Sequence, residues 1–329
     1  MEKLDFLAVG DITTDAFIRI KDAHVTCDID RTKCELCVRF GDKIPYESVT
    51  VVSAVGNAPN AAVAAARLGL SSALITDLGN DAVGTESIVS LKRENVATDF
   101  VRTHEEIPSN YHYVLWYEEE RTILVKHNAY PYTFPDIEPP AWLYLSSLGE
   151  SSLPYHEEVA AYLAAHPETK LAFQPGTFQM KLGKEKLRDI YACADAFFCN
   201  REEAQRILGS TEENIPELAK MLGGLGPKTV FISDGPRGAY AFDGSRAWKT
   251  PMYPDPKPPV DRTGAGDAFA STVTAMLARG KSIPEALSYG PVNSMSVVQE
   301  VGAQKGLLSL ETIEKLLSEK PAGYEVTEL

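Results

Sequence analysis

The sequence predicts an α/β protein of three layers, in which a central, mostly parallel β-sheet is covered by helices on both faces. The first observation is a series of apolar runs of strand length, each followed by turn residues: AWLYLSSLG (141–149), KLAFQPG (170–176), DAFFCN (195–200) and TVFISDG (229–235). The second is that helical patterns such as YHEEVAAYLAAH (155–166) and REEAQRILG (201–209) lie between these runs. Ligands are therefore expected at the carboxyl ends of the strands.

The same alternation extends over most of the chain. Short apolar runs bounded by turn residues predict strands, and amphipathic or alanine-rich segments predict helices, one of which ends near Gly69. Further strands are expected at 6–11 and 72–79, and further helices at 60–70, 81–95, 185–194 and 215–225. We expect residues 1–329 to form a single domain.

Two regions, 16–53 and 110–126, break this alternation. Their apolar residues repeat at period two, which is typical of antiparallel strands, and a charged turn, EEER (118–121), lies inside the second region. We expect them to form a small β-sheet that projects from the core and acts as a lid. Its exposed edges could pair between two subunits and give a homodimer.

The charge of the chain limits its partners. There are 32 Lys and Arg against 46 Asp and Glu, a net charge of −14, with no basic run. Binding to nucleic acid or to an anionic membrane is therefore not expected, although a small anion can still be held by backbone N–H groups. The N-terminus lacks the pattern of a signal peptide, and no uncharged apolar run approaches the ~20 residues of a membrane helix. The cytoplasm is the expected location.

The stretch DRTGAGDAFA (261–270) carries the strongest chemical signal. Gly264, Ala265 and Gly266 allow a tight turn into the helix that follows, and N–H groups at a helix start form an anion site. Asp267 in the first turn places a carboxylate beside that site, which is the pairing that phosphoryl transfer needs. The alternative is a simple Asp cap after a glycine turn.

Several motifs together resemble the ribokinase-like (PfkB) carbohydrate kinases. DRTGAGDAF resembles the signature of that family that contains its catalytic base. Five other segments resemble its remaining motifs, in family order: VGDITTDAF (9–17), VGNAPNAAVAAARLG (55–69), NREE (200–203), SDGPRGAY (233–240) and GAQKG (302–306). The resemblance covers nearly the whole chain and implies a three-layer ribokinase-like fold.

The resemblance also implies residue roles. Asp267 would be the catalytic base, and Gly264, Ala265 and Gly266 would form the anion hole. The acceptor would be held by Asp15, Gly56, Asn57 and Asn60, since carboxylate and amide groups suit hydroxyls. On the nucleotide side the implied residues are Asn200 and Glu203 near Mg²⁺, with Ser233, Gly235, Gly238 and Asn293 around ATP and Arg237 near its phosphates.

A monovalent cation is a further expectation from the resemblance. Many members bind one through the loop that here holds Asp261 and Thr263 and through the loop near Gly302, so potassium activation is expected. Arg262 departs from the Thr that is frequent in the family, and Val55 precedes Gly56 where two glycines are frequent. These departures leave the phosphoryl-transfer motifs intact but leave the identity of the acceptor open.

Three of the five cysteines form a separate cluster, HVTCDIDRTKCELC (24–37). His24, Cys27, Cys34 and Cys37 have ligand types that suit a structural zinc ion. The alternative is three unligated thiols and a surface histidine. Without an export signal, disulfides are not expected. Cys193 and Cys199 fit a buried strand.

These observations predict an ATP-dependent kinase that phosphorylates a hydroxymethyl group of a sugar or nucleoside, with Mg-ATP as donor. A kinase of a sugar phosphate is an alternative, although the substrate motifs contain no cluster of Arg or Lys. A non-catalytic regulator that binds sugar or nucleotide on the same fold is another. A nicotinamide dehydrogenase is excluded, because VGDITTDA after the first strand has no G-x-G-x-x-G.

Overall fold

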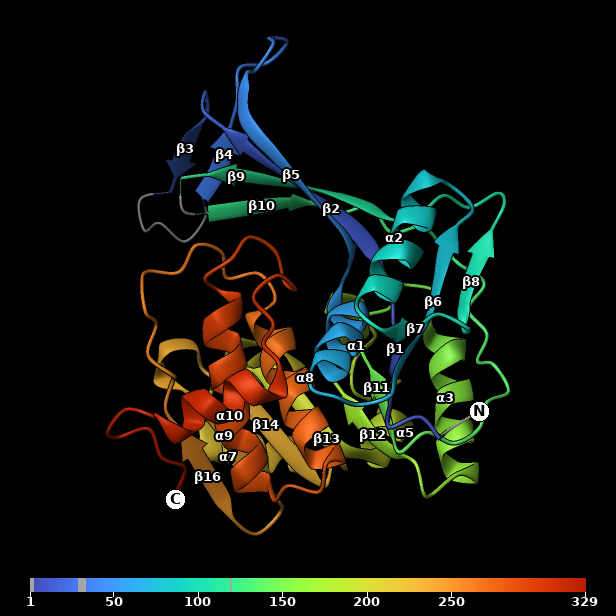
Figure 1. The fold of residues 1–329 in the computed structure, drawn as a ribbon, viewed down its shortest axis with the longest axis vertical. Coiled ribbons are helices and arrows are strands. Elements are labelled where there is room, and N and C mark those ends of the chain that lie inside the picture. The colour runs from blue at the N-terminus through green and yellow to red at the C-terminus, as the bar shows by residue number, and fades with distance from the viewer. Residues whose placement is uncertain (1–2, 29–33, 119) are drawn as a thin grey trace.

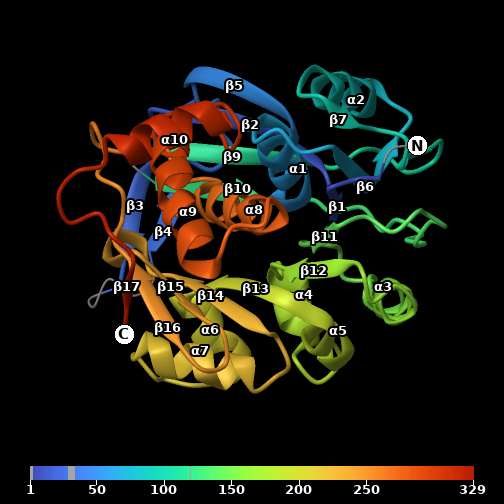
Figure 2. The same cartoon turned by 60° about the horizontal axis from the view of Figure 1, so that its bottom comes forward.

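The computed structural model describes residues 3–28, 34–118 and 120–329. Eleven strands form one large twisted sheet, which Figure 1 and Figure 2 show between two groups of helices. The strand order is β17 (Thr327–Glu328), β16 (Ala247–Thr250), β15 (Ala239–Phe242), β14 (Thr229–Ser233), β13 (Ala194–Asn200), β12 (Lys170–Phe173), β11 (Trp142–Leu145), β1 (Phe6–Val9), β6 (Ser72–Gly79) and β7 (Val96–Ala97), while β8 (Val101–His104) also pairs with β6.

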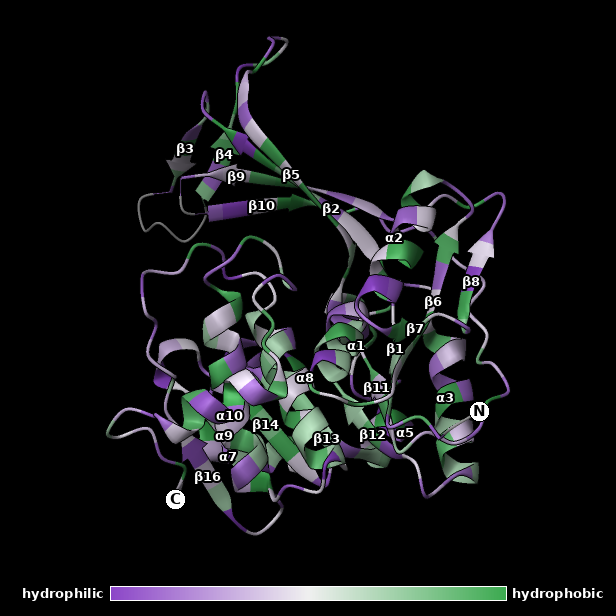
Figure 3. Cartoon of the chain, in the orientation of Figure 1, coloured by the Kyte–Doolittle hydropathy of each residue, from purple (hydrophilic) through white to green (hydrophobic). Residues whose placement is uncertain are grey.

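Neighbouring strands are parallel from β14 to β7 in this order. The pairs β14–β15, β15–β16 and β16–β17 are antiparallel. The predicted α/β class with a mostly parallel sheet is therefore confirmed. The central strands β14, β13, β12, β11 and β1 are almost wholly buried because helices cover both faces of the sheet. Figure 3 shows the corresponding hydrophobic colouring of the central strands.

Helices on the first face are α1 (Asn57–Arg67), α8 (Ala265–Ala278), α9 (Ile283–Val297) and α10 (Leu310–Ser318), with α2 (Ala82–Arg93) near the edge strands. The second face is covered by α3 (Leu153–Ala165), α4 (Thr177–Leu182), α5 (Arg188–Cys193), α6 (Arg201–Leu208) and α7 (Ile215–Gly223). Each face has its own hydrophobic core. Alanines of α1 pack with Phe198 and Phe269 on the first, and Phe173, Tyr191 and Phe197 lie in the second.

A second sheet of four strands extends from the core, and we call it the projecting sheet (Figure 1). Its order is β10 (Glu120–Leu124), β9 (Tyr111–Tyr117), β2 (Thr13–Ile20) and β5 (Tyr46–Val55). The hairpin of β3 (His24–Cys27) and β4 (Cys34–Cys37) lies beside it. Within the described ranges, no helix has the length and apolar composition required to cross a membrane.

Candidate active site

Asp267 lies in the first turn of α8, where three amide side chains hold its carboxylate. Asn57 Nδ2 donates to Oδ1 at 2.7 Å, and Asn60 Nδ2 donates to Oδ2 at 2.8 Å. Gln174 Nε2 also donates to Oδ1, at 3.1 Å. The two asparagines are on α1, whereas Gln174 follows strand β12. Asn57 and Asn60 were expected to hold the acceptor, and here they hold the predicted base.

A second layer of polar groups fixes these amides. Gln304 Nε2 donates to Asn60 Oδ1 at 3.0 Å and to the carbonyl of Ala54 at 2.7 Å. The buried Tyr144 hydroxyl donates to Gln174 Oε1. Because the amide oxygens of Asn60 and Gln174 already accept these hydrogen bonds, the NH₂ groups of the two side chains are directed at Asp267. Sequence reasoning missed Gln174, although the turn QPG marked a strand end.

The surroundings of Asp267 also set its protonation. Burial raises the pKa of the Asp267 carboxyl group, while the hydrogen bonds from Asn60, Asn57 and Gln174 act in the opposite direction. A carboxylate with a raised pKa is a stronger base than an exposed aspartate, which suits it to accept a proton from a hydroxyl group.

The turn before Asp267 requires glycine at one position. Gly264 caps α8 with φ 81°, and a Cβ there would lie 2.3 Å from Ala303 Cβ. A Cβ on Gly266 would meet no atom within 4 Å, so this backbone faces open space. The first N–H groups of α8 have no intrahelical acceptor. Ala265 N donates to the Arg262 carbonyl at 3.4 Å, and the N–H groups that follow at this helix start are suited to an anion beside Asp267.

Polar groups of the projecting sheet and of nearby loops lie together where the acceptor is expected, and we call this region the acceptor side. His112 Nδ1 lies 3.3 Å from Asp15 Oδ1, and these residues are paired across β2 and β9. Asp15 Oδ1 and His112 Nε2 are buried and have no hydrogen-bond partner within the described ranges. Because buried polar groups are normally paired, His112 Nε2 is suited to bind a ligand hydroxyl beside the Asp15 carboxylate.

A second carboxylate, that of Asp11, lies beside this pair. Asp11 Oδ1 accepts from the Tyr132 hydroxyl at 2.9 Å, and Oδ2 lies 3.2 Å from His127 Nδ1. The His127 and His112 rings are 5.2 Å apart. A Cβ on Gly56, which has φ 122°, would lie 2.8 Å from the Asp11 carbonyl oxygen. Gly56 therefore allows α1 to approach this loop closely. Asp11, His112, His127 and Tyr132 were not predicted as site residues.

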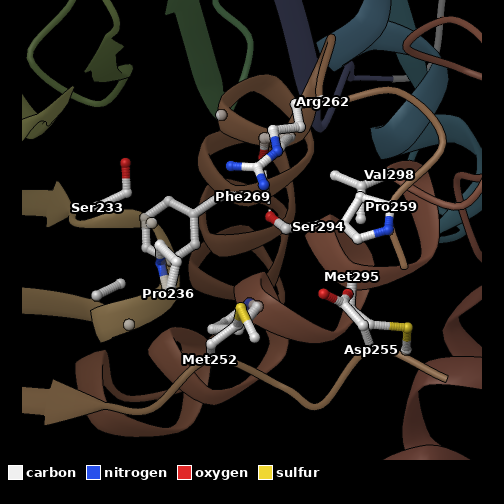
Figure 4. Close-up of a pocket in the computed structure, with 16 residues that line it drawn as sticks. Ser233, Pro236, Met252, Asp255, Pro259, Arg262, Phe269, Ser294, Met295 and Val298 are labelled. Atoms are coloured by element: carbon white, nitrogen blue, oxygen red, sulfur yellow. Dashed lines mark hydrogen bonds between the residues drawn. The ribbon is translucent and has the colours of Figure 1, made fainter. Parts of the chain in front are cut away.

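A cavity of about 280 Å³ lies at the N-terminus of α8 (Figure 4). Its walls are mainly apolar, and its residues come from the β14–β15 turn, the 252–266 segment, α8 and α9: Ser233, Gly235, Pro236, Gly238, Ala239, Met252, Asp255, Pro259, Arg262, Ala265, Gly266, Phe269, Pro291, Ser294, Met295 and Val298. Ala265 and Gly266 thus border both the cavity and Asp267. An apolar slot that leads to an anion site suits a nucleotide.

The predicted nucleotide residues Ser233, Gly235 and Gly238 all line this cavity. Gly238 has φ 95°, and a Cβ there would lie 2.0 Å from the Thr250 carbonyl oxygen, so the turn requires glycine. Arg237 forms two hydrogen bonds of 2.6 Å with Asp234 and is absent from the cavity wall. Arg262 instead supplies the arginine side chain at the cavity (Figure 4).

Asn200 and Glu203 form a capping box at the start of α6. Glu203 N donates to Asn200 Oδ1 at 2.8 Å, and Asn200 N donates to Glu203 Oε2 at 2.9 Å. Burial raises the pKa of Glu203, and the negative charge of Asp267 adds to this effect.

Asn293 has both ends of its amide engaged in the core. Its Nδ2 donates to Thr272 Oγ1 at 2.8 Å, and its Oδ1 accepts from Leu308 N at 2.9 Å. The side chain is fully buried and is not part of the cavity wall, which its neighbours Ser294 and Met295 help to form. In this structure the Asn293 amide thus joins α8, α9 and the segment before α10.

The residues expected to bind a monovalent cation lie together before the anion-hole turn. Thr263 donates to Asp261 Oδ1 through Oγ1 at 2.8 Å, and Gly302 N donates to Oδ2 at 3.0 Å. Arg121 Nε lies 3.6 Å from Asp261 Oδ1. Both carboxylate oxygens of Asp261 are thus already engaged.

The cysteine cluster differs from the zinc expectation. Cys27 and Cys34, which face each other across β3 and β4, form a disulfide, while Cys37 is free. This corrects the expectation that disulfides are absent, and it removes two of the four thiolate and imidazole ligands of the predicted zinc site. Across the described ranges, no group of three or more His, Cys, Asp or Glu is placed to hold a metal ion.

Solved structures share this architecture. A nucleoside kinase of Methanocaldococcus jannaschii superposes with a TM-score of 0.79 at 18% identity, covering 96% of this chain and 99% of that one. Arabidopsis thaliana ribokinase complexed with ribose and ATP has the same TM-score at 21% identity, covering 96% and 99% of the two chains. The class of fold is therefore that of the ribokinase-like kinases, as predicted.

The family follows from the sequence comparisons. Residues 23–310 match the pfkB family of carbohydrate kinases. Ribokinase of Bacillus subtilis is 27% identical over 304 residues, covering 89% of this chain and 99% of that protein. Cytidine kinase of Thermococcus kodakarensis is 33% identical over 119 residues, covering 36% of this chain and 42% of that protein. The chain belongs to the pfkB carbohydrate kinase family and is a kinase, which implies ATP with magnesium.

Proposed function

We propose that this kinase transfers the γ-phosphoryl group of ATP to a hydroxymethyl group of a neutral sugar or nucleoside, with Asp267 as general base. The observation that carries the proposal is the arrangement of polar groups around the Asp267 carboxylate in the first turn of α8. Three amides orient it, and the N-terminus of α8, which borders the cavity, lies directly beside it.

In this mechanism Asp267 accepts the proton of the acceptor hydroxyl as its oxygen attacks the γ-phosphorus. The bond from that phosphorus to the bridging oxygen of ADP breaks. The N–H groups of residues 264–266 would stabilise the charge on the transferring group. Asn57, Asn60 and Gln174 hold Asp267 in position, and the projecting sheet is the proposed lid that excludes water.

The nucleotide and its metal fit the residues present. The apolar cavity and the glycine cradle at Gly238, which a Cβ would fill, suit an adenosine group. Magnesium is usually carried by phosphates and water with few carboxylates, so the Asn200–Glu203 pair is suited to order its water shell. When bound, the metal would neutralise phosphate charge.

The acceptor side supports a neutral polyol and not a sugar phosphate. Asp11 and Asp15 would repel a phosphate, while Asp15, whose Oδ1 lies 3.3 Å from His112 Nδ1, and His112 Nε2, which has no hydrogen-bond partner within the described ranges, are suited to hydroxyls. Phe178, 5.5 Å from His127, adds an aromatic surface that a nucleobase could contact. Both sugars and nucleosides therefore stay within the proposal.

The test is ADP release with Mg-ATP against free sugars, sugar phosphates, sugar acids and nucleosides, for the wild type and Asp267→Asn. Loss of a general base lowers kcat by roughly 10²–10⁴-fold, so an acceptor-dependent rate should almost vanish in the variant. A wild type that binds ligands by calorimetry but releases no ADP would favour the non-catalytic regulator. A sugar phosphate as the best acceptor would contradict the neutral-acceptor proposal.

A further inference from the structure

Arg121 joins the projecting sheet to the loop that precedes the anion hole. It lies on β10, yet one of its terminal nitrogens donates to the carbonyl of Val260 at 2.7 Å. Its Nε is 3.6 Å from Asp261 Oδ1, and the exposed fractions of the two side chains are 11% and 1%. This is a buried ion pair between the projecting sheet and the core.

The sheet itself orients this arginine. Arg121 is paired with Trp116 of β9, and Trp116 is paired with Arg19 of β2, so all three share one face. The guanidinium of Arg121 lies 3.9 Å from the centre of the Trp116 ring. Asp15, Phe17 and Arg19 lie two positions apart along β2, so their side chains belong to the same face of the sheet. The face that carries Asp15 of the acceptor side thus also carries the contact to the core.

The oxygens at this point are those expected to bind potassium. Thr263 N and Oγ1 donate to Asp261 Oδ1 at 3.1 and 2.8 Å, and Gly302 N donates to Oδ2 at 3.0 Å. The Val260 carbonyl accepts from Arg121. A potassium ion needs several free oxygen ligands in place of its water shell. Here the Arg121 guanidinium already forms an ion pair with the Asp261 carboxylate and a hydrogen bond with the Val260 carbonyl. The residues present therefore do not fit a resident cation while Arg121 is in place.

We propose that Arg121 supplies the positive charge at the Asp261 loop and latches the projecting sheet over the site, so that this enzyme works without a monovalent cation. The proposal rests on the kinase function, because the loop leads directly into Gly264 and the anion hole. When the projecting sheet moves away from the core, the positive charge of Arg121 leaves the Asp261 loop. The same side chain thereby ties closure of the sheet to the electrostatics of the anion hole.

The experiment compares potassium chloride with choline chloride at equal ionic strength. Two quantities are measured, the thermal midpoint Tm of the protein without substrates and kcat/KM for the acceptor. The variants are Arg121→Gln, the conservative Arg121→Lys, and Arg19→Gln as a matched control. Arg19 also stacks on Trp116, at 4.9 Å, but its ion pair is with Glu47 of the projecting sheet.

We expect the wild type and Arg19→Gln to show the same Tm and the same kcat/KM in both salts. In choline chloride, Arg121→Gln should lose at least about tenfold in kcat/KM, because a buried charge pair is broken. Potassium should partly restore that rate and raise the Tm of this variant alone. Arg121→Lys should keep more activity than Arg121→Gln in choline chloride.

A wild type whose Tm and rate both require potassium would overturn the proposal, and so would an Arg121→Gln variant with the salt response of the wild type. The wild-type comparison decides the matter even where Arg121→Gln does not fold. If no acceptor is phosphorylated at all, the proposed function fails. The Tm comparison then still tests whether Arg121 excludes the cation.

Discussion

The two sides of the site are built in different ways. On the acceptor side, charged and amide side chains hold one another, as in the contacts of Asp267 with Asn57 and of Asp11 with Tyr132. On the nucleotide side, backbone turns and apolar side chains such as Phe269 and Met295 form the wall. One side depends on the orientation of polar groups, and the other depends on space.

This difference determines which substitutions should matter. On the acceptor side, removing a polar group leaves a buried partner without a hydrogen bond, which costs about 1–3 kcal/mol. On the nucleotide side, the sensitive positions are glycines whose Cβ would collide with backbone, Gly264 and Gly238. The predictions below test this contrast, beginning with the largest effect.

Gly264→Ala should be the most damaging single change on the nucleotide side. The new Cβ would lie 2.3 Å from Ala303 Cβ, at a φ of 81°. Displacing the turn moves the N–H groups of the anion hole, and loss of such a donor lowers kcat by roughly 10²–10³-fold. The overpacking should also reduce the free energy of unfolding by about 1–3 kcal/mol. Acceptor-dependent ADP release and urea unfolding measure the two effects.

Gly266→Ala is the matched control for the fold. Its Cβ would meet no atom within 4 Å, and the residue lies inside α8. The free energy of unfolding should therefore stay equal or rise by about 0.4–1 kcal/mol. Equal destabilisation by the two substitutions would contradict the view that space, and not glycine flexibility in general, limits this turn.

The pH dependence of kcat/KM tests the acceptor side. The base acts when deprotonated, and burial raises the pKa of Asp267. Activity should therefore fall as pH decreases through an apparent pKa above the usual aspartate value of about 3.9. Gln174→Leu removes one hydrogen bond that lowers this pKa, so the acid limb should move to higher pH.

Tyr144→Phe is the control for that shift. It removes the hydroxyl that donates to Gln174 but leaves the Gln174 amide available to Asp267. Its acid limb should lie closer to that of the wild type than the limb of Gln174→Leu. An acid limb that is the same in all three proteins would mean that another group controls the profile.

Two arginines near the cavity differ in whether their charge reaches it. Arg262 lines the cavity, whereas Arg237 is tied to Asp234. Arg262→Gln should raise the KM for ATP about tenfold, on the order of 1.4 kcal/mol, because a charge near the phosphates is lost. Arg237→Gln should leave that KM nearly unchanged. Steady-state kinetics with varied ATP distinguish them, and the reverse order would show that the Asp234 pair opens when ATP binds.

The fold was largely predictable because most strands of the core sheet are marked by a local sequence pattern. Apolar runs followed by turns gave β11, β12, β13 and β14 near their observed positions. The antiparallel strands β15, β16 and β17 were not predicted. β15 and β16 form a local hairpin in which Phe242 pairs with Ala247, whereas β17 joins β16 through residues far apart, such as Trp248 and Glu328. A local pattern carries no information about such partners.

The site was predictable where one motif contains all its parts. The 264–267 turn depends on consecutive residues, so its placement next to a cavity could be expected from the sequence. Gln174 could not be assigned, because its role appears only when the end of β12 meets α8. Asn293 shows the opposite case. Its position on α9 was expected, but the rotation of the helix turns its amide into the core.

The hairpin of β3 and β4 should affect neither side of the site, which makes it a negative test of the comparison. With Cys27 and Cys34 joined, the denatured protein without reductant should show three titratable thiols, and reduction should raise this to all five cysteines. The double variant Cys27→Ser, Cys34→Ser should keep the KM for ATP and for the acceptor, because neither residue contacts Asp267 or the cavity. Five thiols before reduction, together with one bound zinc per chain, would restore the metal hypothesis. A change in only the acceptor KM would instead show that the hairpin acts through the projecting sheet, whose β2 and β9 carry Asp15 and His112.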